Sequence, residues 1–418
     1  MTRVAVLASE PLRPRMAGIG IRYAELARRL PRPGLDVVVV TSGDPAEARA
    51  VPGMPADVRP FVRGDLRRTL ADCDAVVAQG QLANDVVLEA PDLPTAIDLY
   101  DPWLVENLHY ARDLGFGPYL NDHAAWVLQM SRGDFFLCSS AEQRHFYLGF
   151  LTALGRVNPK RLAVDPALDG LVGVVPFGVP ESLPPHRPYL APRAPGERRL
   201  LFGALYDWYD PWPLLEALER LDRPAWRLFV VRTPNPATTP QRVWTEVEAW
   251  CRRRGFWEER VRPIDWVPED RRYDLLRDVD LLVALHRPTL ETSLSLRTRF
   301  LDAFAVACPV ITTDGGVVSG LLREHPAGWI VAPGDAEGLA RVLVEALDHE
   351  PRAERREAAR ALAERYRWER ALAPLVAFCL APAVDPTKHE FAHRPATVSP
   401  PRPPDRLRDV MRRWLARR

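Results

Sequence analysis

The residues best suited to bind a charged ligand lie in one polar turn after the apolar segment Asp280–Leu285. We expect that segment to be a strand, and the turn to lead into a helix with Ser295 as its N-cap. Arg297, Thr298 and Arg299 then fall in the first turn of this helix. A helix N-terminus carries free N–H groups and about half a positive charge, so it attracts anions. Two arginines and several hydroxyls at this point predict a doubly charged ligand, most simply a diphosphate.

Asp302 lies one helical turn further along, where its carboxylate can bind a diol such as ribose. Together with the two arginines it predicts a site for a nucleotide-diphosphate compound. The alternative is that Arg297 and Arg299 are ordinary surface arginines and that Asp302 is a solvated helix residue. The turn follows the C-terminal end of a strand, where ligands bind in open α/β sheets, and this position favours a binding site.

Two pairs of glycines mark further points where backbone can approach a ligand. Gly18 and Gly20 precede an amphipathic helix, and Gly315 and Gly316 follow the predicted strand Pro309–Thr313. Because glycine has no side chain, either pair can border a bound phosphate or sugar. Either pair can equally form an ordinary tight turn at the start of a helix.

Carboxylates follow the predicted strand Thr95–Tyr100. Asp98 and Asp101 are three residues apart, so they cannot both point inward from a regular strand. We expect a sugar or acceptor role for Asp98 and a catalytic role for Asp101, with the simple start of a turn as the alternative. Glu106 and His109 lie at positions i and i+3 of the helix that follows, and we expect a solvated pair there.

Aromatic residues follow another predicted strand, Leu200–Ala204. Tyr206 and Trp208 lie at its C-terminal end, with Asp207 and Asp210 beside them. Aromatic side chains at this position can stack on a base or a sugar, and they can equally cover a hydrophobic core. We interpret Tyr206 and Trp208 as residues of the ligand site.

The elements that must position these residues alternate between strand and helix in both halves of the chain. Most of the predicted strands are continuous apolar runs, as expected of parallel strands buried on both faces. They are Val4–Ala8, Asp36–Thr41, Asp74–Gln79, Thr95–Tyr100, Phe135–Ser139, Val172–Phe177, Leu200–Ala204, Arg227–Val231, Val261–Asp265, Asp280–Leu285, Pro309–Thr313 and Trp329–Val331. The repeated βα units predict an α/β fold of two doubly wound, Rossmann-like domains.

The expected domain boundaries follow from this alternation and from the distribution of proline. We expect an N-terminal domain at residues 1–180, a proline-rich linker at 181–198 and a C-terminal domain at 199–350. A helix at 351–382, centred on Ala353–Leu380, is expected to pack back across both domains. A second proline-rich linker at 383–404 and a basic amphipathic helix at 405–418 complete the chain.

Composition excludes several classes of protein. The net charge is +1, so no overall charge recruits nucleic acid. The 5 cysteines have no metal-ligand spacing and are typical of core residues in a reducing compartment. No apolar run approaches the length of a membrane span, and the chain begins with a strand rather than a signal peptide. We therefore expect a cytoplasmic protein that needs no metal ion or other cofactor.

The final segment has an apolar stripe at helical spacing, formed by Leu407, Val410, Met411, Trp414 and Leu415. Arginines surround the stripe. A short basic helix with a tryptophan on its apolar side can lie in an anionic membrane interface, which would place the protein at the inner face of the cytoplasmic membrane. The alternative is that the stripe packs on the two domains or on a second subunit.

Four stretches resemble glycosyltransferase family 4, a class of retaining enzymes with the GT-B fold, and the resemblance covers about residues 1–380. RMAGIGIRYAELARRL resembles the glycine loop and first helix of that fold. IDLYDPWLVENL resembles the central cleft segment of a bacterial cell-surface polysaccharide subset. RPIDWVPEDRRYDLLRDVDLLVALHRP resembles the stretch around the nucleotide base, and ETSLSLRTRFLDAFAVACPVI resembles the donor-site loop and helix.

This resemblance implies two Rossmann-like domains that face a cleft, with the acceptor on the N-terminal side and the nucleotide sugar on the C-terminal side. It places Trp266 and Val267 beside the base, with a core tryptophan as the alternative. The family pattern has two glutamates eight positions apart, whereas Asp302 stands here at the second position and Leu294 at the first. Glu291 is the nearest carboxylate to the first position, and we expect it to be catalytic.

The chain also lacks the basic pair that the family carries after the first C-terminal strand, and we expect Arg297 and Arg299 to hold the diphosphate instead. The resemblance then implies transfer of a sugar, with retention, from a nucleotide-diphosphate sugar to a polysaccharide or lipid-linked glycan of the bacterial cell envelope. Two alternatives stay open. A nucleotide-sugar epimerase would need acid–base groups around the sugar, and a non-catalytic scaffold would fit the altered glutamate spacing.

Overall fold

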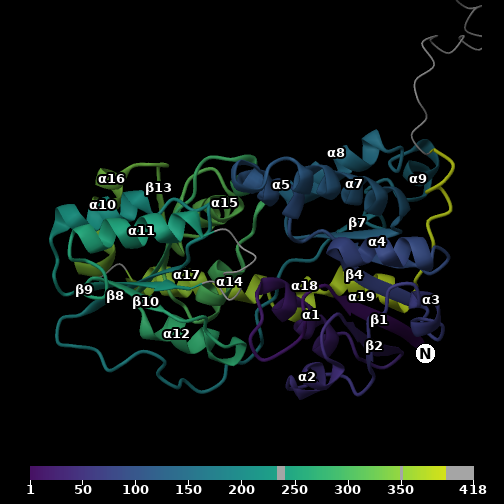
Figure 1. Cartoon of the computed structure of the whole chain (residues 1–418), viewed down its shortest axis with the longest axis horizontal. Helices are drawn as coiled ribbons and strands as arrows, with labels where there is room; N and C mark the ends of the chain where they lie inside the picture. Colours follow the sequence, from purple (N-terminus) through teal and green to yellow (C-terminus); the bar gives the residue numbers. More distant parts are fainter. Residues whose placement is uncertain (233–240, 349–351, 392–418) are drawn as a thin grey trace, which may run out of the picture.

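Two parallel β-sheets with helices on their faces form the computed structural model, which describes residues 1–232, 241–348 and 352–391 (Figure 1). The N-terminal sheet has seven strands in the order β3-β2-β1-β4-β5-β6-β7. These strands are β1 (Thr2–Ala8), β2 (Leu35–Thr41), β3 (Val58–Pro60), β4 (Ala75–Gln79), β5 (Thr95–Asp98), β6 (Phe135–Cys138) and β7 (Val172–Val174). The C-terminal sheet has six strands in the order β10-β9-β8-β11-β12-β13. They are β8 (Arg198–Ala204), β9 (Trp226–Val231), β10 (Val261–Ile264), β11 (Leu281–Ala284), β12 (Val310–Thr313) and β13 (Gly328–Val331).

Helices connect the strands of the N-terminal half. They are α1 (Gly18–Arg29), α2 (Pro45–Ala50), α3 (Leu66–Thr69), α4 (Gly80–Glu89), α5 (Trp103–Asn107), η1 (Leu108–Tyr110), α6 (Ala111–Leu114), α7 (Gly117–Arg132), α8 (Ala141–Ala153) and α9 (Pro159–Val164). Those of the C-terminal half are α10 (Trp212–Leu221), α11 (Arg242–Arg253), η2 (Glu269–Arg271), α12 (Arg272–Asp278), α13 (Leu290–Leu294), α14 (Thr298–Ala305), α15 (Val317–Glu324) and α16 (Ala336–Asp348). None of the helices in the described ranges combines the length and apolar composition that crossing a bilayer requires.

The order of the strands fixes where a ligand can bind. β1 pairs in parallel with both β2 and β4, and β8 pairs in parallel with both β9 and β11. The strand order therefore reverses beside β1 in one sheet and beside β8 in the other. In doubly wound sheets ligands bind outside the carboxyl ends of the strands at this switch point. The predicted fold of two Rossmann-like domains is confirmed.

The last helices of the described chain return across both halves. α17 (Arg352–Arg365) packs on α14, and α19 (Ala373–Leu380) packs on β1 and β7, with α18 (Trp368–Ala371) between them (Figure 1). The sequence predicted one helix over Ala353–Leu380, and this prediction is wrong. The N–H of Val179 donates to the carbonyl of Tyr366 and the N–H of Trp368 donates to the carbonyl of Val179, so the backbone leaves the helix at this point.

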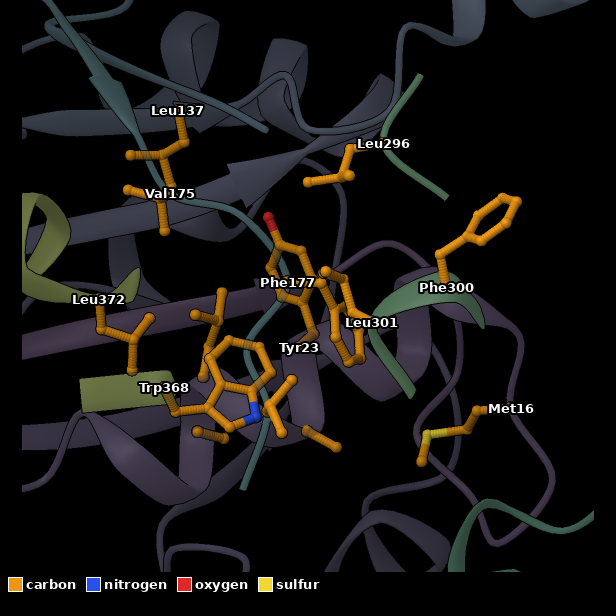
Figure 2. Packing of buried hydrophobic residues seen from close by; sticks show 14 of the residues in the cluster. Met16, Tyr23, Leu137, Val175, Phe177, Leu296, Phe300, Leu301, Trp368 and Leu372 are labelled. Atoms are coloured by element: carbon orange, nitrogen blue, oxygen red, sulfur yellow. The ribbon is translucent and has the colours of Figure 1, made fainter. Parts of the chain in front are cut away.

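Trp368 joins the two halves in one hydrophobic core. Its ring lies 5.1 Å from that of Phe177, and Leu301 of α14 belongs to the same cluster. Figure 2 shows Phe177 and Tyr23 between Trp368 on one side and Leu301 on the other. The helix that carries the predicted anion site is therefore packed on the junction of the two halves.

The segment expected to be the second linker is partly fixed to the N-terminal half. Asp385 is buried and forms ion pairs of 2.8 Å with Arg156 and with Arg161. Lys388 pairs with Asp134 at 2.9 Å. Residues 385–388 are thus anchored to the N-terminal half by buried charges, contrary to the expectation of a free linker. The predicted helix at 405–418 lies outside the described residues.

Position 178 requires glycine, because the ring of Trp368 packs directly against its backbone. A Cβ atom at position 178 would lie 2.2 Å from the ring of Trp368. We expect Gly178→Ala to lower the free energy of unfolding by about 1–3 kcal/mol, because the ring is buried and must shift. Gly149, in the middle of α8, is the matched control, since a Cβ there meets nothing within 4 Å. Gly149→Ala should raise stability by roughly 0.5–1 kcal/mol.

Urea unfolding of the two variants beside the unchanged protein measures the difference. Equal unfolding midpoints for Gly178→Ala and Gly149→Ala would show that Trp368 does not hold the two halves together in this way.

Candidate active site

A cleft with a volume of about 430 Å³ lies between the two halves, at the carboxyl ends of the strands. The N-terminal half contributes Ala17–Ile19 and several residues from Tyr100 to Tyr110. The C-terminal half contributes the turn after β8, Trp266, and the segment Ser295–Arg299. Because both switch points open into this cleft, it is the position in which a doubly wound protein of two domains binds its ligand.

Most of the predicted site residues line this cleft or a pocket of about 80 Å³ beside it. The cleft is lined by Gly18, Asp101, Tyr206, Trp208, Trp266, Ser295, Arg297, Thr298 and Arg299. Four of these also line the smaller pocket: Gly18, Trp266, Thr298 and Arg299. Val267 and Asp302 line the smaller pocket alone. Asp98, Gly20, Glu291, Gly315 and Gly316 line neither of the two.

The predicted N-cap, Ser295, is not the start of α14. Thr289 caps the short helix α13 through Thr292, and Ser295 ends that helix. The Ser295 hydroxyl donates to the Glu291 carboxylate at 2.7 Å. Arg297 is the N-cap residue of α14, and its side chain makes no capping hydrogen bond. The prediction fails because Leu290–Leu294 forms a helical turn of its own, but the N-terminus of α14 still faces the cleft through Thr298 and Arg299.

Arg297 is held by buried carboxylates. Its guanidinium lies 2.6 Å from the carboxylate of Glu291, whose side chain is 0% exposed, and 4.0 Å from Glu106. It also lies over the rings of Trp208 and Tyr209, at 5.8 and 5.2 Å from their centroids. Glu291 is therefore a residue that positions Arg297, and it does not line the cleft.

Arg299 has the opposite environment. It is half-buried, lines both the cleft and the smaller pocket, and makes no ion pair or hydrogen bond within the part of the chain that the structure describes. Its guanidinium lies over Gly203, where a Cβ atom would meet Nε of Arg299 at 3.2 Å and φ is +85°. Gly203 lies at the irregularity in the pairing of β8 with β9, so the strand leaves room for this arginine. Of the two predicted diphosphate ligands, Arg299 is the one open to an anion.

Asp302 is fixed in the smaller pocket by a chain of charges. Its carboxylate lies 3.3 Å from Arg272, and Arg272 lies 3.2 Å from Glu269. Glu269 in turn pairs with Arg28 of α1 at 3.0 Å, so the chain crosses from one half to the other. Burial raises the pKa of Asp302, and the guanidinium of Arg272 opposes this.

Two carboxyl groups form the N-terminal wall of the cleft. Asp101 and Glu106 are hydrogen-bonded to each other, and burial raises the pKa of Asp101 to about 6. Burial and the neighbouring Asp101 also raise the pKa of Glu106 well above its usual value. The expectation that Glu106 forms a solvated pair with His109 is wrong, because α5 turns Glu106 into the cleft. A spacing of three residues places two side chains on one helix face, but it does not tell which face meets a cleft.

Asp98 lies behind this wall and not on it. Its side chain is 0% exposed and accepts hydrogen bonds from Arg22 at 2.6 and 3.2 Å. Arg22 also donates to the carbonyls of Val175 and Pro176, and its guanidinium lies 4.4 Å from the ring centre of Tyr100. This placement does not fit the expected sugar or acceptor role of Asp98.

A carboxylate of the chain itself, that of Glu10, binds the glycine loop at the start of α1. The carboxylate of Glu10 accepts the backbone N–H groups of Ala17 and Gly20, both at 2.7 Å. A Cβ atom on Gly20 would lie 2.9 Å from this carboxylate and 2.8 Å from Met16. Gly18 lines the cleft, but the N-terminus of α1 is already neutralised by Glu10.

Trp266 connects the smaller pocket to the N-terminal half. Its indole Nε1 donates to the carbonyl of Met16 at 3.1 Å. The hydroxyl of Tyr100 donates to the carbonyl of Leu296 at 2.9 Å on the other side of the cleft. The two halves therefore meet on both sides of the site, and a ligand in the cleft contacts both. Gly315 and Gly316 lie at the start of α15, where Gly315 has φ +96° and both N–H groups donate to Ser319.

Residues 198–349 match the protein family described as Glycosyl transferases group 1. This part of the chain is a glycosyltransferase domain. The prediction of a glycosyltransferase enzyme is thereby confirmed, and the matched residues include the turn after β8, Trp266 and the whole of α14. No curated protein matches the chain by sequence.

Solved structures of glycosyltransferases are similar to the whole described fold. Sucrose-phosphate synthase from Thermosynechococcus elongatus is 15% identical, with a TM-score of 0.60 over 90% of this chain and 98% of its own. HepE of Anabaena in complex with UDP-glucose is 15% identical, with a TM-score of 0.63 over 91% of this chain and 100% of its own. WaaG, a glycosyltransferase involved in lipopolysaccharide biosynthesis, is 18% identical, with a TM-score of 0.57 over 91% and 100%. At these identities the likeness establishes the two-domain fold.

Proposed function

We propose that this glycosyltransferase takes its sugar from a nucleoside-diphosphate sugar bound across the cleft, with the diphosphate at Arg299. The observation that carries the proposal is the arginine itself, which faces the cleft at the N-terminus of α14 and makes no ion pair or hydrogen bond with a carboxylate of the described residues. Thr298 adds a hydroxyl at the same point, and the helix N-terminus adds its partial positive charge. UDP-glucose is bound by HepE, whose fold is similar, and this supports a nucleotide sugar as the donor.

The smaller pocket suits the nucleoside. Trp266, Val267 and Asp302 line it, and Arg299 lines both this pocket and the cleft. An aromatic wall and a carboxylate are the groups that a base and a ribose diol require. We place the base against Trp266, the ribose near Asp302 and the diphosphate at Arg299, so that the sugar extends into the larger cleft.

The transfer step needs one base and one stabilised leaving group. The oxygen of the acceptor hydroxyl forms a bond to the anomeric carbon on the face from which the diphosphate departs, as retention requires. The bond from that carbon to the diphosphate oxygen breaks with its electron pair on the diphosphate. Arg299 and the N-terminus of α14 stabilise the negative charge that develops there. The proton of the hydroxyl passes to the Asp101 carboxylate, whose raised pKa of about 6 suits a general base.

Three finer features belong to the proposal as well. Membership in glycosyltransferase family 4, retention at the anomeric carbon and a glycan acceptor of the bacterial cell envelope extend the resemblance found in the sequence. The mechanism requires no metal ion or other cofactor. An epimerase and a non-catalytic scaffold lose support, because the matched family is one of glycosyl transferases.

Arg299→Ala should weaken binding of a nucleoside diphosphate by about ten- to a hundredfold and leave binding of the nucleoside unchanged. A hydrogen bond to a charged group contributes about 1.5–3 kcal/mol, which corresponds to this loss. UDP, GDP, dTDP and ADP are first compared by the rise in melting temperature that each produces. Calorimetric titration with the best diphosphate and with its nucleoside then measures both affinities.

Arg220→Ala, on the exposed face of α10, is the matched control and should bind both ligands as the unchanged protein does. If Arg299→Ala and Arg220→Ala bind the diphosphate equally well, the diphosphate does not lie at Arg299.

A further inference from the structure

The charges that line the cleft are separated between its two walls. Its two arginines, Arg297 and Arg299, come from the C-terminal half, and its two carboxyl groups, Asp101 and Glu106, come from the N-terminal half. No basic side chain of the described N-terminal half lines the cleft. Arg13 and Arg15 of that half are exposed and lie outside the lining. The wall opposite the donor diphosphate is therefore acidic.

The one structure on this wall that would attract an anion is already neutralised. The N-terminus of α1 faces the cleft at Gly18, but Glu10 accepts two of its backbone N–H groups at 2.7 Å. The space at Gly20 is filled by Glu10 and Met16. A phosphate or carboxylate on an acceptor would meet the Glu10 carboxylate there in place of free N–H donors.

Arg297 does not make the charge of this part of the cleft positive. It is balanced by Glu291 at 2.6 Å, while Glu106 lies further from it at 4.0 Å. The arginine thus neutralises Glu291, and the Asp101–Glu106 pair keeps its negative charge when one proton is shared between them. Like charges that approach in a partly buried site repel each other strongly, because water screens them less.

Aromatic rings line the cleft beside the Asp101–Glu106 pair. Tyr110 of η1 meets Trp208 across the cleft with 6.0 Å between ring centres, and Tyr206 stacks on Trp208 at 4.7 Å. All three rings line the cleft. Aromatic faces beside carboxylates that accept hydrogen bonds suit an uncharged sugar ring, which has apolar C–H faces and donating hydroxyls.

We propose that the acceptor is an uncharged sugar, and that sugar phosphates and uronic acids are excluded by the negative charge of the Asp101–Glu106 pair on the N-terminal wall of the cleft. This inference rests on the proposed function, since it concerns the second substrate of the same transfer. Specificity of this kind comes from repulsion of the wrong partner as much as from attraction of the right one. Glu106 acts here as a specificity residue, beside the base Asp101.

The test uses the full chain and matched pairs of acceptors. Methyl glycosides of glucose, galactose and mannose are each offered together with their 6-phosphates, in equal amounts. The donor is the radiolabelled nucleotide sugar whose diphosphate raises the melting temperature most. Products are separated on an anion exchanger after removal of the donor, so that neutral and phosphorylated products are counted apart. We expect label in the neutral fraction to exceed that in the phosphorylated fraction by tenfold or more.

Glu106→Lys places a positive charge on this wall, beside Asp101. It should raise the ratio of phosphorylated to neutral product by about tenfold, whereas Glu216→Lys, on the exposed face of α10, should leave the ratio unchanged. Label mainly in phosphorylated product, or no labelled neutral product, would overturn the inference. If the diphosphate still stabilises the protein in that case, the donor assignment stands, and a protein that no diphosphate stabilises contradicts the proposed function itself.

Discussion

Asp98→Ala is expected to lower the free energy of unfolding by about 3–5 kcal/mol, because it leaves the Arg22 guanidinium buried without a partner carboxylate. The side chains of Arg22 and Asp98 are 1% and 0% exposed and lie 2.6 Å apart. The remaining contacts of Arg22 are two backbone carbonyls and the ring of Tyr100, and none of these carries a full negative charge.

Urea unfolding followed by circular dichroism measures this change. Asp169→Ala is the matched control, since Asp169 pairs with Arg144 at 3.0 Å but its side chain is 80% exposed. Exposed pairs contribute about 0.2–1 kcal/mol, so the control should lose at most that amount. A loss for Asp98→Ala no larger than that of the control would mean that the buried pair is not a structural feature of the N-terminal half.

Arg297→Ala should likewise destabilise the fold by about 3–5 kcal/mol, because it strands the buried carboxylate of Glu291. Arg299→Ala should leave the unfolding free energy within about 0.5 kcal/mol, since the half-buried Arg299 forms no ion pair with a carboxylate of the described residues. The two arginines are two positions apart on the chain but differ in role. Thermal and urea unfolding of both variants separates the residue that holds the site from the residue that binds the ligand.

A second substitution tests the cause of the Arg297 effect. Glu291→Gln in the Arg297→Ala background removes the stranded charge while it keeps the hydrogen bond to Ser295 possible. We expect the double variant to be more stable than Arg297→Ala alone. If it is equally unstable or less stable, the loss comes from the packing of Arg297 on Trp208 and Tyr209, and the account of a stranded charge is wrong.

The sheets could be predicted from the sequence because their strands are buried on both faces. A run such as Val37–Val40 has no polar residue that could face water, so its type and burial follow from composition alone. The polar turn before α14 could also be placed, since the turn after a parallel strand opens at the carboxyl edge of the sheet. The start of the helix could not be placed to the residue, because Thr289 and Ser295 are both good N-caps and only the packing of α13 decides between them.

The roles of individual charges could not be predicted from the sequence, because each depends on which side chain the fold places beside it. Asp98 and Asp101 have the same side chain and lie three residues apart, but Arg22 binds the first and Glu106 the second. The same holds for Arg297 and Arg299, of which one faces a buried glutamate and the other faces the cleft. Nothing in the sequence pointed to Glu10, because it lies seven positions before Ala17, whose N–H group it binds, and no motif connects the two.

The central claim is that a nucleoside diphosphate bridges the smaller pocket and the cleft at Arg299. The most direct measurement is a crystal structure of the full chain with the diphosphate that stabilises it most. We expect the terminal phosphate to lie within hydrogen-bond distance of the Arg299 guanidinium and of the backbone N–H groups that begin α14. We expect the base to lie beside Trp266. A diphosphate bound at the Gly18–Gly20 loop, or held by Arg297 with Arg299 turned to solvent, would contradict it.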